Sequence, residues 1–580
     1  MITLPTNLVA MRQAGVLTAV DVHLASLLAR LSGETQPDAM LAAALACQWP
    51  QRGHACVDLH DLVSDHLLPV EDTGALPRFE LPEPEAWLQS LRASSFVGLP
   101  AEKTPLVLWQ DRWLYLRRSW QDETRLTEAI QAWSETAGSD VDKAVLEKRT
   151  ARVFDSNGFD REDQQQQATL LAVQQPLFVL TGGPGTGKTS TLLRLMAVLL
   201  ETEPQLSIAL AAPTGKAALR IRESLLQGLE DLNCDGSVKS RIPTEAQTLH
   251  RLLGYQSRRA GFRHNERQPV PYDVVVVDEA SMMGLSLTAK LLAALPRRCR
   301  LVLVGDREQL PSVDSGSVFA DLCAEESYVP HVELTRNYRF SAGTGIGALA
   351  AAIRCGDAAR TVSLLDEDLQ PLPVPHQLKD ALWARLQAYL SNLQNATDPE
   401  AAFSAFEQLR VLCAHRTGPF GAEAVNQAIH ELLVSRFKVD RLQRWYPGRP
   451  ILISENDYSA ECFNGDTGLV LPWQGKLYVF FRQGGGDYRR LPPACLPAHE
   501  SAYAMTVHKS QGSEFDEVLL LLTDRPSRLL TRELLYTGVT RARRGVQVWS
   551  PQANVEACVD TQLHRTSGLR ARFAAGSISE

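Results

Sequence analysis

The sequence predicts an α/β fold with parallel sheets, because three apolar runs of strand length each end in a polar motif. The runs lie at residues 176–180, 272–277 and 301–304. Strands of a parallel sheet are buried on both faces, so they read as continuous apolar runs. Ligands of such open sheets bind beyond the carboxyl ends of the strands. The polar motifs are therefore expected to line one site.

The first run leads into a glycine-rich loop, Gly182–Thr189, which is followed by the helical stretch TLLRLMAVLL. Glycines let the backbone close around phosphates, and the N-terminus of the next helix favours an anion. Lys188 is expected to reach the β- and γ-phosphates of ATP, and Thr189 to hold Mg²⁺. The order of strand, loop and helix disfavours a chance glycine-rich turn. The expected nucleotide-binding residues of the loop are Gly182, Gly183, Pro184, Gly185, Thr186, Gly187, Lys188, Thr189 and Ser190.

The second and third motifs supply groups for hydrolysis. Asp278 follows the valine run 274–277 and is expected to bind Mg²⁺, directly or through water, while Glu279 polarises the attacking water. A kinase would instead position a hydroxyl nucleophile, so the acidic pair favours a nucleotide hydrolase. The alternative for this pair is a helix N-cap. Gln309, after the third run, carries an amide that can contact both a γ-phosphate and a water.

Eight stretches carry a resemblance to a known family, and they extend over residues 182–544. They are GGPGTGKTS (182–190), AAPTGKAALR (211–220), TLHRLLG (248–254), VVVVDEASMM (274–283), GDREQLPSVDSGSVFADL (305–322), LTRNYRF (334–340), TVHKSQGSEFDEV (506–518) and YTGVTRARR (536–544). With these motifs the chain resembles the superfamily 1 helicases, and within them the RecD subunits of bacterial RecBCD helicase-nucleases (exonuclease V). The resemblance covers about residues 110 to 560.

The resemblance implies further roles in the nucleotide site. Gln165, in the glutamine run 164–167, resembles a glutamine that reads adenine, and its neighbours leave the assignment open by one position. Arg339 and Arg541 resemble two arginine fingers, which are worth roughly 10³–10⁵ in rate in other NTPases. The alternative is a pair of surface ion pairs, each worth under about 1 kcal/mol. The implied catalytic residues are Lys188, Glu279, Gln309, Arg339 and Arg541.

The same resemblance implies a grip on the DNA backbone from two motor domains. The implied DNA-binding residues are Pro213, Thr214, Lys216, Thr248, His250, Arg251, Thr506, His508, Lys509, Ser510 and Gln511. Their hydroxyl, amide and cationic donors suit phosphate oxygens, which give affinity without sequence choice. Tyr338, Phe340 and Tyr536 either stack bases or pack the cleft between domains.

Composition limits the class of protein. A chain of 580 residues with 44% hydrophobic residues needs several cores. Its net charge of −8 argues against a generally basic surface, so a grip on DNA is expected in a local channel. The ten cysteines form no CxxC pair, and no apolar stretch is long enough to span a membrane. The protein is expected to be cytoplasmic.

The fold expected from the resemblance has two RecA-like P-loop motor domains, a mainly helical N-terminal domain and an SH3-like β-barrel insertion. Short strand-like runs between glycine-containing turns predict the insertion at 446–500, and a hairpin is predicted to turn at Gln110 and Asp111. The expected segments are 1–105 (N-terminal partner-docking domain), 106–124 (hairpin connector), 125–340 (motor domain 1A), 341–445 and 501–580 (two parts of motor domain 2A) and 446–500 (insertion).

The N-terminal region shows no catalytic pattern but is rich in tryptophan. It holds six of the ten tryptophans of the chain: Trp49, Trp87, Trp109, Trp113, Trp120 and Trp133. Aromatic residues are enriched at the centres of interfaces, although a small domain also needs them for its own core. Part of this aromatic surface is expected to dock a partner, which by resemblance is a RecC-like subunit.

Taken together, the resemblance implies an ATP-driven 5′-to-3′ translocase on single-stranded DNA, assembled with RecB-like and RecC-like partners at double-strand breaks in repair and recombination. Two alternatives stay open. One is a stand-alone RecD-like helicase, against which the N-terminal region of about 105 residues looks too short for extra helix-hairpin-helix domains. The other is a non-catalytic structural subunit, against which the intact set of catalytic residues speaks. No carboxylate cluster indicates a nuclease site.

Overall fold

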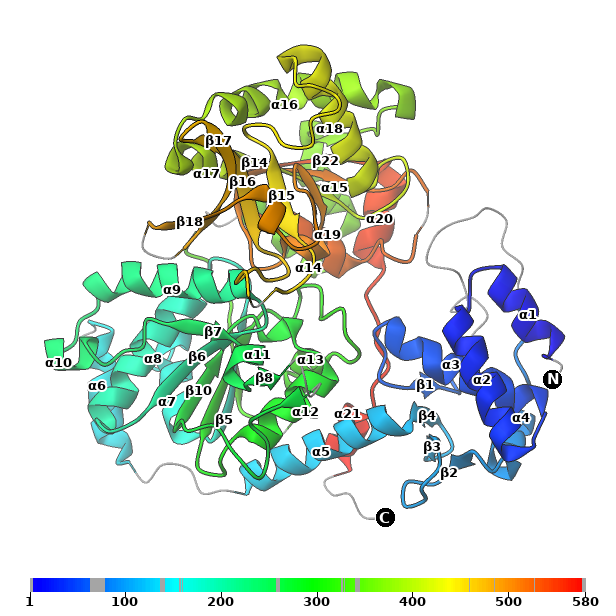
Figure 1. Ribbon diagram of the computed structural model, residues 1–580. Coiled ribbons are helices and arrows are strands. Elements are labelled where there is room, and N and C mark those ends of the chain that lie inside the picture. The colour runs from blue at the N-terminus through cyan, green and yellow to red at the C-terminus, as the bar shows by residue number, and fades with distance from the viewer. Residues whose placement is uncertain are drawn as a thin grey trace.

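Two α/β units lie one above the other, and the N-terminal domain lies beside the lower unit (Figure 1). The computed structural model describes residues 4–62, 79–135, 141–155, 158, 160–256, 261–324, 327, 329–339, 345–457, 459–483, 486–525 and 527–575. None of the helices in these ranges is both long and apolar enough to cross a membrane. The predicted α/β fold class is confirmed.

The lower unit, residues 141–339, is built on a six-stranded parallel sheet in the order β12-β5-β11-β10-β6-β7. Alternate valines of β10 face opposite cores, with Val275 and Val277 on one side and Val274 and Val276 on the other. This double burial explains why the strand reads as an unbroken apolar run. The strands are β5 Leu177–Gly182, β6 Ile208–Ala212, β7 Ala246–Thr248, β10 Val274–Val277, β11 Arg300–Gly305 and β12 His331–Leu334.

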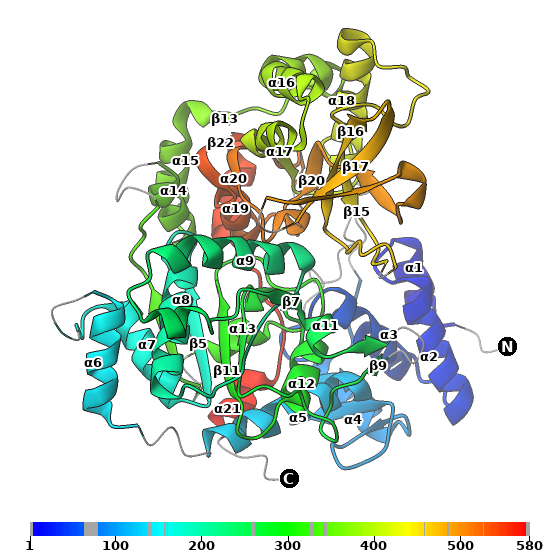
Figure 2. The ribbon, with the colours of Figure 1, turned by 60° about the vertical axis from the view of Figure 1, so that its left-hand side comes forward.

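Helices cover both faces of this sheet (Figure 2). A short pair, β8 Tyr255–Gln256 and β9 Gly261–Phe262, lies outside it. The helices are α6 Lys143–Val153, α7 Gln164–Gln174, α8 Lys188–Thr202, α9 Gly215–Glu230, α10 Gly236–Lys239, α11 Leu249–Leu252, α12 Leu285–Ala294 and α13 Val318–Leu322.

The upper unit, residues 345–445 and 502–560, contains a second parallel sheet in the order β13-β22-β21-β14-β20. Its strands are β13 Leu369–Gln370, β14 Leu409–Cys413, β20 Ala504–Thr506, β21 Phe515–Leu521 and β22 Ala542–Trp549. The helices of this unit are α14 Gly345–Arg354, α15 Ala358–Leu365, α16 Leu378–Asn395, α17 Pro399–Gln408, α18 Ala422–Phe437, α19 Arg532–Val539 and α20 Gln552–Asp560. Each of the two units is therefore built on its own parallel sheet.

The insertion in the upper unit forms a five-stranded antiparallel sheet in the order β18-β17-β16-β15-β19. Its strands are β15 Pro450–Ile453, β16 Thr467–Trp473, β17 Lys476–Arg482, β18 Tyr488–Leu491 and β19 His499–Ser501. Ile451, Val470, Val479 and Phe481 form its own small core. The strands follow the predicted runs, while the SH3-like class stays a prediction.

The N-terminal domain combines helices with a four-stranded sheet in the order β1-β4-β3-β2. Gln110 and Asp111, with φ of 50° and 52°, turn the predicted hairpin. Both hairpin strands pair within this sheet, β4 with β1 and β3 with β2. The elements are α1 Thr6–Gln13, α2 Ala19–Ser32, α3 Pro37–Gln51, β1 Val57–Asp58, α4 Pro84–Ala93, β2 Val97–Gly98, β3 Leu106–Trp109 and β4 Trp113–Leu116.

The tryptophans of this region do not form an exposed docking surface. Trp49, Trp87, Trp120 and Trp133 are all at most 6% exposed and pack in cores. Trp109 and Trp113 are half-buried and lie against one another, with ring centroids 4.9 Å apart. The prediction of an aromatic interface is therefore wrong for the four buried rings, because Trp49, Trp87 and Trp120 pack in cores of the N-terminal region and Trp133 packs in a core of the lower unit.

The C-terminal segment joins all parts of the molecule. After α20 it runs down past the lower unit to α21 Leu569–Ala574, beside α5 Arg117–Ser134 (Figure 1). Arg572, on α21, donates to Glu123 over 3.1 Å and lies 4.0 Å from the Trp120 ring centroid. The Tyr115 hydroxyl donates to the same carboxylate over 2.8 Å. A buried charge is thus held between the N-terminal domain and the end of the chain.

Replacing Arg572 by Ala is expected to destabilise the fold by about 3 kcal/mol or more, because it leaves the buried Glu123 carboxylate without its charged partner. The measurement is the urea midpoint of the transition that α5 and the N-terminal domain undergo, followed by tryptophan fluorescence. The control is Arg544→Ala, since Arg544 is 79% exposed and lies 3.9 Å from Asp516. Equal effects of the two variants would show that the buried pair is not what holds the segment.

Candidate nucleotide site and nucleic-acid face

The glycine-rich loop joins β5 to α8 and is shaped by residues with positive φ. Gly185 and Gly187 have φ of 79° and 85°, a conformation that side chains with a Cβ rarely adopt. Gly183 needs its lack of a side chain for space, because a Cβ there would lie 2.8 Å from the Tyr536 hydroxyl. Gly187 is also the N-cap of α8. The loop can therefore present backbone N–H groups to an anion.

Lys188 lies at the mouth of this loop. Its ammonium donates to the carbonyl oxygens of Gly182 and Gly183 over 2.6 and 3.0 Å. Thr189 and Ser190 follow on the first turn of α8, and all three side chains line a cavity of about 380 Å³. The cavity is lined by residues of both α/β units, so its closure depends on how the units meet.

Two adjacent carboxylates end β10 in the same cavity. Burial, together with the neighbouring Glu279 carboxylate, raises the pKa of Asp278 to about 6. Glu279 has φ of 53°, and its N–H donates to Asp278 over 2.8 Å. A buried carboxylate whose ionised form is disfavoured is suited to a cation, and a threonine hydroxyl lies in the same cavity. The carboxylate of Asp278 and the hydroxyl of Thr189 are therefore oxygen ligands of the kind that would hold Mg²⁺.

The third motif bonds to the upper unit. Gln309 donates to Asp306 over 3.0 Å, and the Tyr536 hydroxyl donates to the same oxygen over 3.1 Å. The N–H of Leu310 donates to the Thr537 hydroxyl over 2.9 Å. These bonds place the amide of Gln309 where both units meet. Tyr536, 4% exposed, packs at the junction, so the stacking alternative for this ring is not available in this conformation.

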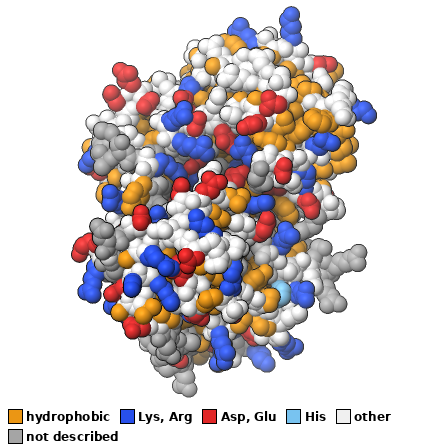
Figure 3. Space-filling view, turned by 90° about the vertical axis from the view of Figure 1, so that its left-hand side faces the viewer, with side chains coloured by type: hydrophobic (Ala, Val, Ile, Leu, Met, Phe, Trp, Pro, Cys, Tyr) orange, Lys and Arg blue, Asp and Glu red, His pale blue; other side chains and the backbone are white. Residues whose placement is uncertain are grey.

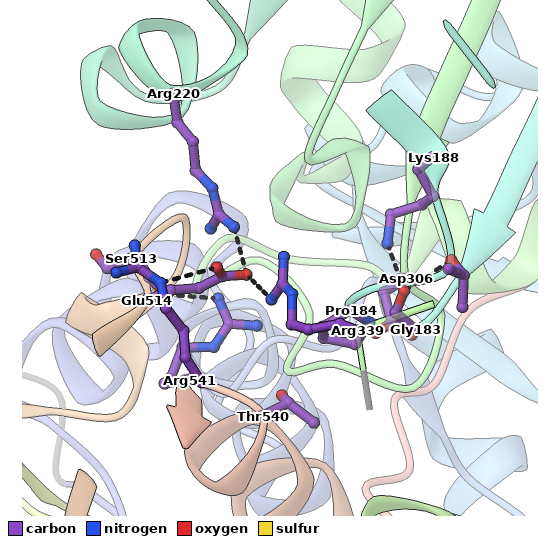
Figure 4. A network of polar contacts seen from close by, with 12 residues as sticks. Gly183, Pro184, Lys188, Arg220, Asp306, Arg339, Ser513, Glu514, Thr540 and Arg541 are labelled. Carbon is purple, nitrogen blue, oxygen red and sulfur yellow. Dashed lines mark hydrogen bonds and ion pairs between the residues drawn. The ribbon is translucent and has the colours of Figure 1, made fainter. Parts of the chain in front are cut away.

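Both predicted arginine fingers line the cavity, and two unpredicted residues accompany them (Figure 4). Arg541 is 2% exposed and donates to the carbonyls of Thr537 and Ser513. Arg339 forms an ion pair with Glu514 over 2.5 Å, and Arg220 on α9 pairs with the same oxygen. Arg220 and Glu514 lie inside two of the matched stretches, but only their contacts across the junction reveal them.

The glutamine run begins α7 next to the loop. The amide of Gln165 donates to the carbonyl of Thr186 over 3.2 Å, and its side chain is buried. Gln164 accepts from the N–H of Thr335 over 2.8 Å. Of these two, Gln165 is the one that contacts the loop, while a contact with adenine stays a prediction.

The predicted DNA-binding residues of the lower unit have different surroundings. The hydroxyls of Thr214 and Thr248 accept from the backbone N–H groups of Ala217 and Arg251 and cap α9 and α11. Lys216 lies at the junction, in a cavity shared with Asp466 of the insertion. Burial, and then Arg410, lowers the pKa of Lys216 to about 7. His250 packs against Tyr255 and Phe262, and Pro213 and Arg251 lie in the same segments.

In the upper unit, Thr506 and Lys509 line a basic cavity of about 440 Å³, together with Arg416, Arg441, Arg444 and Arg449. Lys509 pairs with Glu500 over 2.6 Å. In contrast, Ser510 and Gln511 are buried: Ser510 donates to the carbonyl of Val507, and Gln511 donates across the junction to the carbonyl of Leu310. Burial, and then Arg565, lowers the pKa of His508 to about 4, so it stays neutral.

The surface around the junction carries charges of both signs. On the face drawn in Figure 3, basic and acidic side chains are interspersed. Tyr338 is 58% exposed at the nucleotide cavity, while Phe340 lies outside the described residues. Within the described ranges, no group of three or more His, Cys, Asp or Glu side chains is arranged to hold a metal ion.

Comparison with known proteins agrees with this geometry. Residues 165–315 match the family model of an AAA domain, and residues 501–548 match that of the UvrD-like helicase C-terminal domain. A phosphate loop and acids on one unit that face arginines at the junction define a two-unit nucleotide-driven motor of the helicase class. Residues 13–115 match the model of the N-terminal domain of the RecBCD enzyme subunit RecD.

Relatives extend this match over nearly the whole chain. The RecBCD enzyme subunit RecD of Mycolicibacterium smegmatis is 38% identical and covers 97% of this chain and 99% of the relative. That of Haemophilus influenzae is 31% identical over 96% and 98%. The ATP-dependent RecD2 DNA helicase of Deinococcus radiodurans is 35% identical, over 65% of this chain and 48% of the relative. The chain belongs to the RecD family.

Proposed function

We propose that the chain is an ATP-dependent 5′-to-3′ DNA translocase and helicase that acts as the RecD subunit of a RecBCD complex. The observation that carries this proposal is the cavity at the junction, where the phosphate loop and acids of one unit meet Arg339 and Arg541. Hydrolysis there would be coupled to the relative position of the two units. We place this activity in the cytoplasm, in double-strand break repair and recombination.

The residues of the cavity have distinct parts in hydrolysis. Lys188 neutralises the β- and γ-phosphates, and Glu279 orients and polarises the attacking water. Thr189 and Asp278 would hold Mg²⁺, which supplies charge neutralisation at the phosphates. Gln309 links the γ-phosphate to the upper unit through Asp306 and Tyr536. Arg541 stabilises the charge that develops on the transferred phosphoryl group.

Contacts on both units would turn this cycle into movement along DNA. The half-buried candidates are Thr506 and Lys509 in the upper unit, and Thr214, Lys216 and Thr248 in the lower unit. They offer donors to phosphates rather than to bases, which suits a motor that passes every sequence. The segment that carries Lys509 would be held in shape by three inward-facing neighbours, His508, Ser510 and Gln511, which would not contact the DNA themselves.

The extent of the matches favours a RecBCD subunit over a stand-alone helicase. The chain covers almost the full length of the RecD relatives but about half of the RecD2 helicase of Deinococcus radiodurans. RecB-like and RecC-like proteins are therefore the proposed partners. The third reading, a structural subunit without catalysis, is separated from this proposal by measuring hydrolysis.

Lys188→Gln is expected to abolish hydrolysis stimulated by single-stranded DNA, because the phosphates lose their neutralising charge while little packing is lost. Glu279→Gln is expected to bind ATP and lose turnover. The measurements are steady-state ATPase rates with and without a single-stranded oligonucleotide, and binding of a fluorescent ATP analogue. The control is Lys379→Gln, which removes a half-exposed surface lysine. Near-normal hydrolysis by either site variant would disprove the assignment, and an inactive wild-type chain would favour the structural subunit.

Binding of single-stranded DNA is expected to weaken as the pH rises above about 7, because the Lys216 amine then loses its charge. Charged groups around it are Arg410, Asp466, Glu407 and Arg220. If a phosphate restores the ordinary pKa of the amine, affinity should fall by up to about tenfold per pH unit above 7. The measurement is fluorescence anisotropy of a labelled oligonucleotide between pH 6 and pH 9.

Lys216→Arg should flatten this pH dependence, because a guanidinium keeps its charge throughout the range. Lys509→Arg is the matched control and should leave the slope as it is in the wild-type chain. An unchanged slope in Lys216→Arg would mean that Lys216 does not meet the DNA.

The wild-type chain, tagged and expressed in its native cell, is expected to co-purify with two large partners of RecB and RecC type. Mass spectrometry of the complex at physiological salt is the measurement. Lys188→Gln should recover the same partners, since it changes the nucleotide loop and not the outer surface. Recovery of the chain alone would favour the stand-alone helicase.

A further inference from the structure

Glu514 connects three arginines from both sides of the junction (Figure 4). It lies directly before β21, and its side chain is 8% exposed. One carboxylate oxygen pairs with Arg220 of the lower unit and with Arg339, while the other lies 3.6 Å from Arg543 of the upper unit. None of these contacts is needed to complete either sheet. Glu514 therefore links the two units through charge.

Arg339 is held at its backbone by the phosphate loop and at its guanidinium by Glu514. The N–H of Tyr338 donates to the carbonyl of Gly185 over 2.8 Å, and the Asn337 amide donates to that of Pro184 over 2.8 Å. A Cβ on Gly185 would lie 2.6 Å from the Cβ of Arg339. The backbone of 337–339 thus rests on the phosphate loop. A rotation of the Arg339 side chain alone would move its guanidinium from Glu514 to a phosphate bound in the loop.

The two arginine fingers are held by different kinds of acceptor. Arg541 donates to two backbone carbonyls of its own unit. Arg339 is paired with a carboxylate, so its contact carries an attraction between opposite charges that the carbonyl contacts of Arg541 lack. A γ-phosphate must therefore displace a carboxylate that is paired directly with Arg339, whereas the hydrogen-bond acceptors of Arg541 are backbone carbonyls and the carboxylates of Glu279 and Glu514 act on it without an ion pair.

We propose that Glu514 is a positioning residue that holds the guanidinium of Arg339 away from the phosphate loop. The guanidinium is released when a nucleoside triphosphate binds and its γ-phosphate replaces the Glu514 carboxylate as the partner of Arg339. This proposal rests on the proposed function. Arg220 and Arg543 stay beside the carboxylate when Arg339 leaves, so the exchange does not strand a buried charge. Because the γ-phosphate must displace Glu514, the affinity of the cavity for a triphosphate is lowered. Release of Arg339 from Glu514 then depends on the presence of the γ-phosphate.

The electrostatics of Glu514 support a permanent negative charge at this place. Burial alone would raise its pKa, but Arg220 and Arg339 lower the pKa to about 2. The carboxylate is therefore ionised at every pH at which the motor works. It competes with phosphate under all these conditions.

The chain also connects Glu514 to the nucleic-acid face. Only four residues separate it from Lys509, and Gly512 between them has φ of 71°. Gly512 lies against Ala217 of α9, since a Cβ on it would be 3.5 Å from the Ala217 Cβ. Arg220 is on the same helix. A shift of the Lys509 segment on DNA would thus move the carboxylate relative to both arginines.

Glu514→Gln tests the proposal, because the amide keeps the size of the side chain and removes the charge. The affinity for a non-hydrolysable ATP analogue should rise on the order of tenfold, while that for ADP should stay within about twofold. The stimulation of the ATPase rate by single-stranded DNA should fall, because the release of Arg339 from residue 514 then no longer depends on a movement of the Lys509 segment on DNA. Glu517→Gln, whose partner is the surface residue Arg385, is the matched control and should change neither ratio.

Two further variants separate positioning from stability. In Glu514→Gln combined with Arg339→Ala, the gain in triphosphate affinity should disappear. Glu514→Asp, which retains the charge with a shorter side chain, should give an intermediate affinity and serves if the amide variant does not fold. Equal changes for ATP analogue and ADP, or a weaker affinity for the analogue, would overturn the proposal. Absence of ATPase in the wild-type chain would instead contradict the proposed function.

Discussion

The structure depends on one constraint, which is that the charges of the nucleotide site are divided between two folded units. The lower unit supplies the phosphate loop, Lys188 and the acids, while Arg541 belongs to the upper unit. Charges in a partly enclosed cavity interact more strongly than in water, so small changes in their spacing have large effects. The bonds from Asp306 and Leu310 to Tyr536 and Thr537 fix this spacing. The electrostatics of the nucleotide cavity therefore depend on the relative position of the two units.

The sequence predicted the elements that carry the lower site because their signals are local. A buried parallel strand, a glycine loop and a helix start are each specified by neighbouring residues, and all three lie where they were expected. Arg220 and Glu514 could not be found in this way, because their partners are far apart in the sequence. Likewise, the sequence gives no sign that Ser510 and Gln511 face inward, since polar side chains at a junction look like polar side chains at a surface.

The N-terminal domain shows where composition misleads. Its tryptophans suggested an exposed interface, yet the sheet β1-β4-β3-β2 and its helices bury most of them. The hairpin at residues 106–116 completes that sheet, so the domain extends beyond residue 105. A cut at that position would divide the sheet and expose apolar side chains.

The C-terminal segment connects the upper unit, the lower unit and the N-terminal domain. It leaves the upper unit after α20, bonds to Asp314 and Gly316 of the lower unit through Arg565, and places Arg572 of α21 against Glu123 of α5. A rotation of the upper unit would therefore load a segment that is fixed at its far end by a buried ion pair. The segment is thus held at both ends, by α20 in the upper unit and by Arg572 beside α5. It also gives the N-terminal domain a direct mechanical connection to the unit that carries Lys509 and Glu514.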